Sequence, residues 1–526
     1  MKNIVSKLTI ITLLVLTAVA CKQPVEIIPE PIWDGATTVV CVDIAQLHSK
    51  SGLSNMSSSE LEQLLDEQYP DDKEMTALLR MLMTNPSTSG ISSDKPMYVA
   101  VGEYSDNVNN YTTIVSIDIA SVEAVDAMFK SNKDNFEGYE FEVDGQKRII
   151  TIAEKNTIIG YDNQRLVAIA SDDEQCNLKD VLLRHMTYAA ADMSRFSCYD
   201  IGLYIDIHKV QTKVSDVVNE ESEAEDDTNA YMKYLNDNAT AVYGLTFDNG
   251  SLTLNVDLEG LNEEATKLFK ASNGRSLKML PPSPIAILNM GVNGEAFAEL
   301  ADIAIDAAME ASGGATNEFN IYKNIALGVV SSISGDFMMA LSDANGTISE
   351  DALGDKQLLF TTAKALFTAE VVDDYIMKNI KTYAGSFLSK SGDKYTMNAF
   401  GNQITIAQRD NIFRVGVNND GSLRKPSAAD EEWSNNVVGS YAFAMVDFDQ
   451  FFKSGFGRIA RSAMLEKIVL QTERKAVTSL LDTVDRLYIT IAGDEDKVHG
   501  EFMVVTSDAS KNSLQYIFEL YNSLLF

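Results

Sequence analysis

Short runs in which apolar and polar residues alternate dominate the chain from residue 36 onward, and this period of two predicts half-buried β-strands. Residues 97–104 (MYVAVGEY) and 111–119 (YTTIVSIDI) are two further runs that are typical of antiparallel strands, separated by a short polar stretch. The turn Asp248-Asn249-Gly250 between two alternating runs is a strong signal for a β-hairpin. Strands that are joined by such short turns pair antiparallel.

Helical spacing of apolar residues comes in blocks between these strands. It covers residues 58–69 and 73–83 in the first half of the chain, and residues 298–311 and 319–333 in the second half. Helices that come in blocks beside antiparallel strands must cover a face of the sheet, so the predicted fold class is α+β.

The same order of signals occurs twice, in residues 36–275 and in residues 283–526. Four short segments recur in unchanged order, each about 250 residues later, and this predicts a tandem duplication of a mainly antiparallel sheet unit flanked by helices. The four pairs are Thr37–Asp43 with Ile287–Asn293, Ser121–Asp126 with Thr368–Asp373, Ile150–Ala153 with Ile404–Ala407, and Tyr204–Ile207 with Met445–Phe448. Prolines at positions 281, 282 and 284 mark the junction between the halves. Two arrangements fit this pattern: separate lobes, or one long sheet formed by joined edge strands.

Polar residues follow or end the recurring strands and precede predicted helices. Their side-chain oxygens could line a groove, or each could cap the helix that follows by accepting a bond from a backbone N–H. One of the four is an asparagine, which can cap a helix but cannot act as a general acid or base, so we favour capping. The four residues are Asp43, Asp206, Asn293 and Asp447. Ser121 and Thr368 are likewise predicted to cap short amphipathic helices.

The N-terminus has the layout of a secretory signal, with lysines at positions 2 and 7 followed by an apolar run over residues 8–19. That run is shorter than the ~20 apolar residues that a membrane-spanning helix needs. Residues 18–21 (Ala-Val-Ala-Cys) resemble the lipobox of bacterial lipoproteins, a family in which the cysteine is diacylated and becomes the mature N-terminus. We therefore predict a signal peptide over residues 1–20 and lipidation of Cys21; the alternative is an ordinary cleaved signal in which Cys21 is incidental. Residues 21–35 are proline-rich and predict an extended tether, with Trp33 anchoring it to the first half.

The net charge of the chain bears on its partners more than on its fold. The chain has 76 acidic and 43 basic residues, a net charge of −33. A surface this acidic repels phosphate backbones, so we predict no nucleic-acid partner. Hydrophobic residues make up 45% of the chain and charged residues 23%, values typical of a globular protein rather than a disordered one.

Residues able to carry catalysis are few and scattered. None of the four histidines has a second histidine or a cysteine two to four residues away, which excludes a zinc site built from local ligands. No G-x-S-x-G elbow and no phosphate-binding loop occurs. The sequence therefore predicts no catalytic residue, no metal and no cofactor. The histidines are His48, His185, His208 (predicted on the surface of a helix) and His499.

The acidic run, the remaining cysteines and several apolar side chains are predicted to have structural roles. The acidic run of residues 216–227 is predicted to be a solvated mobile loop rather than a calcium site, because it lacks the alternating ligands of an EF-hand loop. Cys41 lies in an apolar strand and is predicted to be buried, and Cys176 and Cys198 form the only plausible disulfide. The remaining groups are predicted to fill the core: Met75, Met81, Met83, Tyr199, Tyr204, Tyr441 and Phe443.

Four features together resemble a family of envelope lipoproteins of Bacteroides-type bacteria that carries a domain of unknown function. They are the lipobox, the opening at residues 39–53 (VVCVDIAQLHSKSGL), the strand at residues 94–101 (DKPMYVAV) and the duplicated layout. The resemblance implies a Gram-negative envelope address at the outer membrane, and it implies no activity, cofactor or catalytic residue. The residues after Cys21 (KQP) lack the acidic run that resembles a surface-export signal, so the periplasmic and surface faces both stay open.

These observations lead to three functional hypotheses. The first is a non-catalytic binding or assembly module, held at the outer membrane by a lipid anchor on Cys21, with a protein or small-molecule ligand that the sequence leaves unidentified. The second is an envelope hydrolase whose site is assembled between the two halves. The third is a structural spacer.

Overall fold

The chain divides into two compact units in a computed structural model. The first unit comprises Met1–Met232, Asp237–Leu258 and Ala509–Glu519, and the second Lys233–Asn236, Glu259–Asp508 and Leu520–Phe526. The residues that the structure describes are 36–52, 89–92, 94–102, 112–131, 133, 138–153, 156–171, 176–186, 199–207, 209–210, 235–311, 317–350, 356–468, 471–494 and 496–525.

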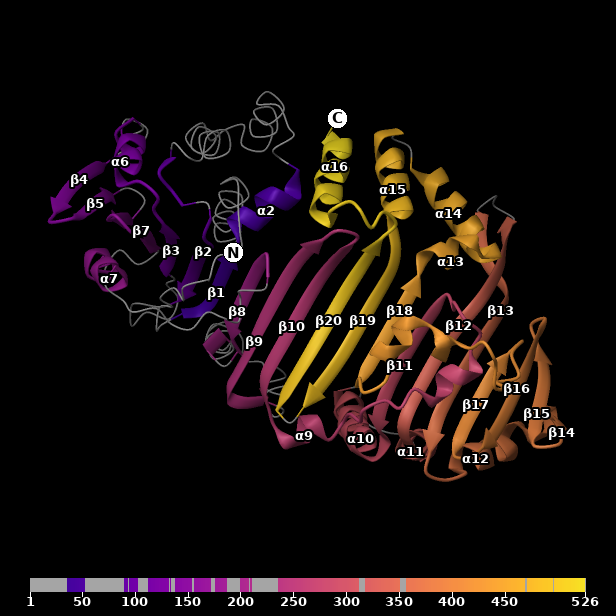
Figure 1. Ribbon diagram of the computed structural model, residues 1–526. Helices are drawn as coiled ribbons and strands as arrows, with labels where there is room; N and C mark the ends of the chain where they lie inside the picture. The colour runs from indigo at the N-terminus through magenta and orange to yellow at the C-terminus, as the bar shows by residue number, and fades with distance from the viewer. Residues whose placement is uncertain are drawn as a thin grey trace. The chain divides into compact units, whose positions relative to one another are not determined.

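The first unit is built on an antiparallel sheet. Hydrogen bonding orders its strands β4-β5-β6-β7-β3-β2-β1-β8-β9-β10 (Figure 1). Helices α2 (Ile44–Ser51), α6 (Val122–Ser131) and α7 (Leu178–His185) accompany them. The strands are β1 (Ala36–Val42), β2 (Met97–Gly102), β3 (Thr112–Asp118), β4 (Tyr139–Asp144), β5 (Lys147–Ile152), β6 (Thr157–Tyr161), β7 (Arg165–Ser171), β8 (Ile201–Asp206), β9 (Leu235–Asp248) and β10 (Ser251–Leu261).

Strand β1 is buried on both faces, which explains why its residues 39–42 (VVCV) are apolar without alternation. On one face Val42 packs in a cluster with Leu47 of α2 and Phe129 of α6. On the other face Cys41 packs in a cluster with Leu182 of α7. The prediction that Cys41 is buried is therefore confirmed, since only 4% of this residue is exposed.

The second unit also contains ten strands. Their order is β14-β15-β16-β17-β13-β12-β11-β18-β19-β20 (Figure 1). All strand pairs with a defined register in either unit are antiparallel, so the fold is α+β, as predicted. The strands are β11 (Ala286–Asn293), β12 (Ile333–Glu350), β13 (Lys356–Val371), β14 (Ser389–Ser391), β15 (Lys394–Ala399), β16 (Asn402–Arg409), β17 (Ile412–Val417), β18 (Ala442–Asp447), β19 (Val484–Asp494) and β20 (Lys497–Thr506).

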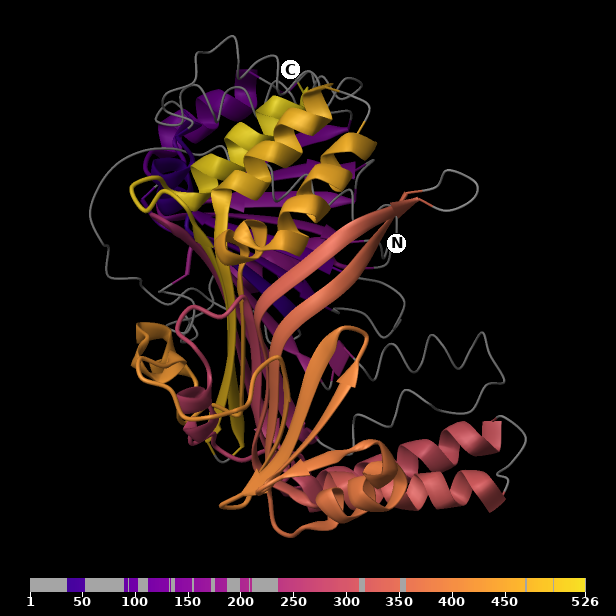
Figure 2. The same ribbon diagram turned by 90° about the vertical axis from the view of Figure 1, so that its right-hand side faces the viewer.

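Helices gather at both ends of the strands in the second unit. Figure 2 shows α10 and α11 at one end and α13, α14 and α15 at the other. The described helices of this part of the chain are α9 (Glu263–Thr266), α10 (Gly294–Ala311), α11 (Asn317–Ser331), α12 (Tyr375–Ala384), α13 (Phe448–Lys453), α14 (Gly455–Lys467) and α15 (Gln471–Thr483), with short 3₁₀ turns η7 (Arg275–Met279), η8 (Gly385–Phe387), η9 (Ala428–Asp430) and η10 (Glu432–Asn436). A last helix, α16 (Ser513–Leu525), has residues in both units. Among the helices that the structure describes, none is both long and apolar enough to cross a membrane.

An aromatic stack marks the core of the second unit. Phe443 is fully buried, and its ring lies 5.7 Å from that of Trp433 and 6.2 Å from that of Tyr488. Burial of Phe443 was predicted because it lies on a strand among apolar residues, and this prediction is confirmed. The predicted core tyrosines are partly buried: Tyr199 and Tyr204 pack against the β1–α7 cluster, and Tyr441 stacks on Phe269.

Two of the four matched pairs of segments lie on strands that hold the same position in the two strand orders. One pair lies on β1 and β11, and the other on β8 and β18. The other two do not correspond. Ile150 lies in β5, one strand from the end of its order, whereas Ile404 lies in β16, two strands from the end. Ser121 precedes α6, whereas Thr368 lies inside a strand.

The prediction that Thr368 caps a helix is wrong. Thr368 is a fully buried residue of β13, where it pairs with Met338 and its Oγ1 atom lies 2.7 Å from the Ser276 hydroxyl. The alternating pattern of this strand continues to Val371, and a β-branched residue fits such a surface. Helix α12 begins seven residues later, where the Asp373 carboxylate accepts a bond from the Tyr375 N–H (2.9 Å). Ser121 does cap its helix, because its hydroxyl accepts a bond from the Ala124 N–H (3.2 Å).

Candidate functional site

Aspartates that follow or end the recurring strands act as helix caps. The carboxylate of Asp43 accepts a bond from the N–H three residues on (2.9 Å), and Asp206 and Asp447 do the same at 3.0 and 2.8 Å. The capping prediction is confirmed for these three residues. The Asn293 amide donates instead to the Lys267 carbonyl (2.8 Å).

The three histidines within the described residues do not converge on a site. His48 and His185 are buried in the first unit, and His499 is exposed in β20 of the second. Burial lowers the pKa of His48, because desolvation disfavours the charged imidazolium. Across the described residues, no group of three or more His, Cys, Asp or Glu side chains could hold a metal ion.

Several predicted features lie outside the described residues. They are the signal peptide, Cys21, Trp33, the methionine-rich helix with Met75, Met81 and Met83, Cys198, His208 and the acidic run of residues 216–227. The pairing of Cys176 with Cys198 therefore stays a prediction.

Asp200 forms the main buried ion pair of the first unit. Only 3% of its side chain is exposed, and both of its oxygens lie 2.8 Å from the Lys50 ammonium. The Phe247 N–H donates to the same carboxylate (2.6 Å), which ties α2 to strand β9. Burial raises the pKa of nearby Asp43, against the hydrogen bond from Gln46, and the negative charge of Asp200 raises it further. These groups satisfy one another, so they hold the fold together rather than present free chemistry.

A second buried carboxylate, Asp336, fixes the segment that leads into the second unit's strands. It is fully buried at the start of β12 and accepts bonds from the backbone N–H groups of Asn273 (3.1 Å) and Gly274 (2.9 Å). Glu370 of β13 continues the network by accepting from the Asn273 amide (3.0 Å) and the Arg275 guanidinium (3.3 Å). Burial raises the pKa of Asp336, and the charge of Glu370 adds to this increase. This network is likewise structural.

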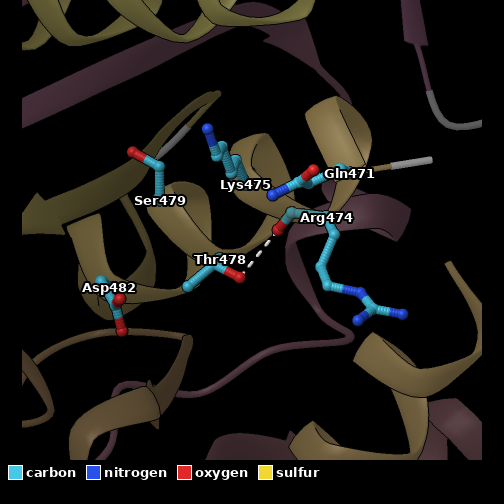
Figure 3. A pocket seen from close by; sticks show the side chains of 6 residues that line it. All are labelled: Gln471, Arg474, Lys475, Thr478, Ser479 and Asp482. Atoms are coloured by element: carbon cyan, nitrogen blue, oxygen red, sulfur yellow. Dashed lines mark hydrogen bonds between the residues drawn. The ribbon is translucent and has the colours of Figure 1, made fainter. Parts of the chain in front are cut away.

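An open pocket of about 680 Å³ lies along one face of α15 (Figure 3). Its lining residues are spaced three and four positions apart, so that they follow one another along a single face of the helix. All six are polar or charged: Gln471, Arg474, Lys475, Thr478, Ser479 and Asp482.

Positive charge exceeds negative charge in this pocket. Arg474 and Lys475 are both exposed near the start of α15, and Figure 3 shows their charged groups extending in different directions from the helix. One guanidinium nitrogen of Arg474 donates to the Ile468 carbonyl (2.8 Å), whereas Lys475 has no ion-pair or hydrogen-bond partner within the described part of the chain. Asp482, at the other end, is balanced by Arg461 of α14. Arg474 and Lys475 are therefore the cations of this pocket that no carboxylate of the described residues pairs with.

Hydroxyl groups lie between the charged ends of the pocket. The Thr478 hydroxyl donates to the carbonyl of Arg474 (2.7 Å), which leaves its oxygen able to accept a bond. The side chain of Ser479 has no hydrogen-bond partner among the described residues, so it can donate and accept. The pocket can therefore hold oxyanions and hydroxylated molecules.

The same geometry gives little support for covalent catalysis. Ser479 lies one helical turn after Lys475, and a serine needs an adjacent base to become a nucleophile. A lysine serves as that base where it is desolvated, and Lys475 is exposed. No histidine or cysteine lines the pocket.

Sequence reasoning missed this pocket. A signal for it exists, because the polar residues from Gln471 to Asp482 repeat at helical spacing and include two adjacent cations. That pattern is also typical of any solvated helix face, so it draws attention only once the position of α15 is known.

The chain belongs to the family described as Domain of unknown function (DUF4836), whose family model matches residues 26–415. The matched segment ends inside β17, so the α15 pocket lies beyond it. No curated protein and no solved structure matches the chain significantly.

Proposed function

We propose that the protein is a non-catalytic binding module of the cell envelope, held at the outer membrane by a lipid anchor on Cys21. The observation that best supports binding is the α15 pocket, which combines two cations, an amide and two hydroxyls without a desolvated base. The carboxylates at the strand ends support the same proposal, because three of them cap helices and are thereby occupied.

The anchor rests on the sequence. An apolar run ends in Ala18-Val19-Ala20-Cys21, and a proline-containing stretch separates this cysteine from the first strand. Diacylation would bury many CH₂ groups at ~0.8 kcal/mol each, which gives stable attachment. The resemblance to Bacteroides-type envelope lipoproteins supports the outer membrane as the address, with either face of it compatible.

Metabolic labelling tests the anchor. Cells that express the full chain are grown with a labelled fatty acid, and the wild type is compared with Cys21→Ser and with the control Cys176→Ser. We expect label in the wild type and in the control and none in Cys21→Ser. Equal labelling of all three would refute lipidation at Cys21.

A substrate panel separates binding from hydrolysis, the rival function. The purified chain is incubated with glycan, peptide and ester substrates, and Ser479→Ala serves as the diagnostic variant because Ser479 is the pocket hydroxyl closest to meeting the needs of a nucleophile. The binding proposal expects no turnover by either protein. Turnover of any substrate would refute the non-catalytic proposal, and its loss in Ser479→Ala would assign the reaction to the α15 pocket.

We also propose that residues 36–275 and 283–526 arose by tandem duplication. The strand order supports this proposal. The first unit has the order β4-β5-β6-β7-β3-β2-β1-β8-β9-β10, and adding ten to each strand number gives the order of the second unit. The ten strands of one unit should superpose on those of the other in this correspondence. Failure of the core strands β1, β2, β3 and β8 to superpose on β11, β12, β13 and β18 would refute a common origin.

A further inference from the structure

We propose that the α15 pocket binds a short acidic oligosaccharide, with its anionic groups at Arg474 and Lys475 and its hydroxyls at Gln471, Thr478 and Ser479. The inference deepens the proposed binding function by naming the chemical class of the ligand. It does not depend on where the chain is anchored.

The composition of the pocket disfavours ligands that need an aromatic platform or a buried apolar anchor. Small-molecule pockets are lined mainly by apolar and aromatic side chains, and protein interfaces are centred on buried aromatic or arginine anchors. None of the six residues that line this pocket is of an apolar or aromatic type. A nucleotide would lack a ring on which its base could stack. The lining offers a ligand hydrogen-bonding groups along the length of the helix face, beside the aliphatic parts of the same side chains.

The spacing of the donors favours an oligomer over a single small anion. From Gln471 to Asp482 the lining residues span three turns, roughly 16 Å at 1.5 Å per residue. The Arg474 and Lys475 groups extend in different directions, so that one phosphate or sulfate would meet only one of them (Figure 3). Successive sugar acids along a chain can reach both cations. The amide and the hydroxyls on either side of the two cations match sugar hydroxyls. Gln471 and Ser479 can donate and accept, and Thr478, whose hydroxyl already donates to a carbonyl, can accept.

Charge balance also sets the length of the ligand. The whole chain carries −33, so a long polyanion is repelled where it extends beyond the two cations of the pocket. A ligand of a few sugar units stays within the pocket. Because the cations are exposed, binding must weaken as salt is added.

Isothermal titration calorimetry of the full mature chain in detergent tests the proposal with three probes: tri-galacturonic acid, the neutral trisaccharide maltotriose and inorganic phosphate. We expect binding of tri-galacturonic acid alone. Arg474→Gln and Lys475→Gln should each weaken it roughly tenfold, which is the loss of one charge-assisted hydrogen bond. The matched control is Lys390→Gln on β14, an exposed lysine that has no ion-pair partner within the described residues and should bind like the wild type.

Three results would overturn the proposal: no heat with tri-galacturonic acid at millimolar concentration, equal affinity for maltotriose, or equal loss in Lys390→Gln and Lys475→Gln. Circular dichroism spectra of all variants exclude misfolding, which these exposed positions make unexpected. Release of reducing ends during the titration would instead refute the non-catalytic function while leaving the ligand class intact. Loss of fatty-acid labelling would refute the anchor alone.

Discussion

Replacing Asp200 with alanine should destabilise the first unit through a small number of identifiable contacts. The substitution removes the acceptor for both Lys50 bonds (2.8 Å) and for the Phe247 N–H (2.6 Å). Asp200 is almost fully buried, whereas 19% of the Lys50 side chain is exposed. Lys50 can therefore recover some hydration and approach Asp248, which lies 3.9 Å away, but the buried Phe247 N–H cannot reach water.

The expected loss follows from these differences. Removing one partner of a buried ion pair typically costs 3–5 kcal/mol, and an orphaned buried N–H costs about 1–3 kcal/mol. Partial hydration of Lys50 and relief of the repulsion between Asp43 and Asp200 both reduce the total. We expect Asp200→Ala to lower the free energy of unfolding of this unit by about 3 kcal/mol.

Hydrogen exchange followed by mass spectrometry measures this loss locally. Peptides from β1, β8 and β9 should lose protection in Asp200→Ala, while those from β18 and β19 keep it. The control is Glu142→Gln, which removes an exposed pair with Lys179 (2.7 Å) and should leave protection unchanged. Unchanged protection of β9 in Asp200→Ala would show that the buried pair does not support the sheet.

Three further predictions concern burial. Cys41 should react with iodoacetamide only after unfolding, because burial raises the pKa of its thiol to about 12; labelling of the folded chain at neutral pH, read by peptide mass spectrometry, would contradict this. Phe443→Ala should lower the free energy of unfolding of the second unit by about 3–5 kcal/mol, because it removes a fully buried ring. The fluorescence of Trp433, which stacks on Phe443, should then show unfolding at a lower urea concentration, and an unchanged midpoint would refute the aromatic stack. Burial raises the pKa of the Asp336 carboxyl above its ordinary 3.8. The folded chain therefore binds the carboxyl proton more tightly than the unfolded chain does, so Asp336 reduces the free energy of unfolding as pH rises above 3.8. Asp336→Asn should make the urea midpoint fall less steeply as pH rises above the ordinary pKa of an aspartate. A steeper fall in the variant would contradict the raised pKa of Asp336.

Local sequence patterns predicted the elements that depend on neighbouring residues. Short runs rich in apolar and β-branched residues located β2 and β3, and the Asp248-Asn249-Gly250 turn located the β9–β10 hairpin, where Gly250 has a positive φ of 80°. Such a turn favours glycine, because residues with a Cβ rarely adopt that backbone conformation. The aspartate caps were predictable for the same reason: donor and acceptor lie three residues apart.

Long-range features were less accessible. Strand β1 pairs with β8, so that Val40 faces Leu203, and no local signal encodes a contact across that many residues. Thr368 was misassigned because a hydroxyl followed by acidic residues fits a helix start as well as a strand end. The α15 pocket depends on how its helix is placed, which its polar spacing alone does not reveal.

Mass spectrometry of the N-terminal peptide, from protein extracted out of native membranes, tests the central claim most directly. We predict a mature chain that begins at Cys21 and carries the mass of a diacylglycerol on its sulfur. A mature chain that begins at another residue, or one that begins at an unmodified Cys21, would contradict the assignment of this protein as a lipid-anchored envelope protein.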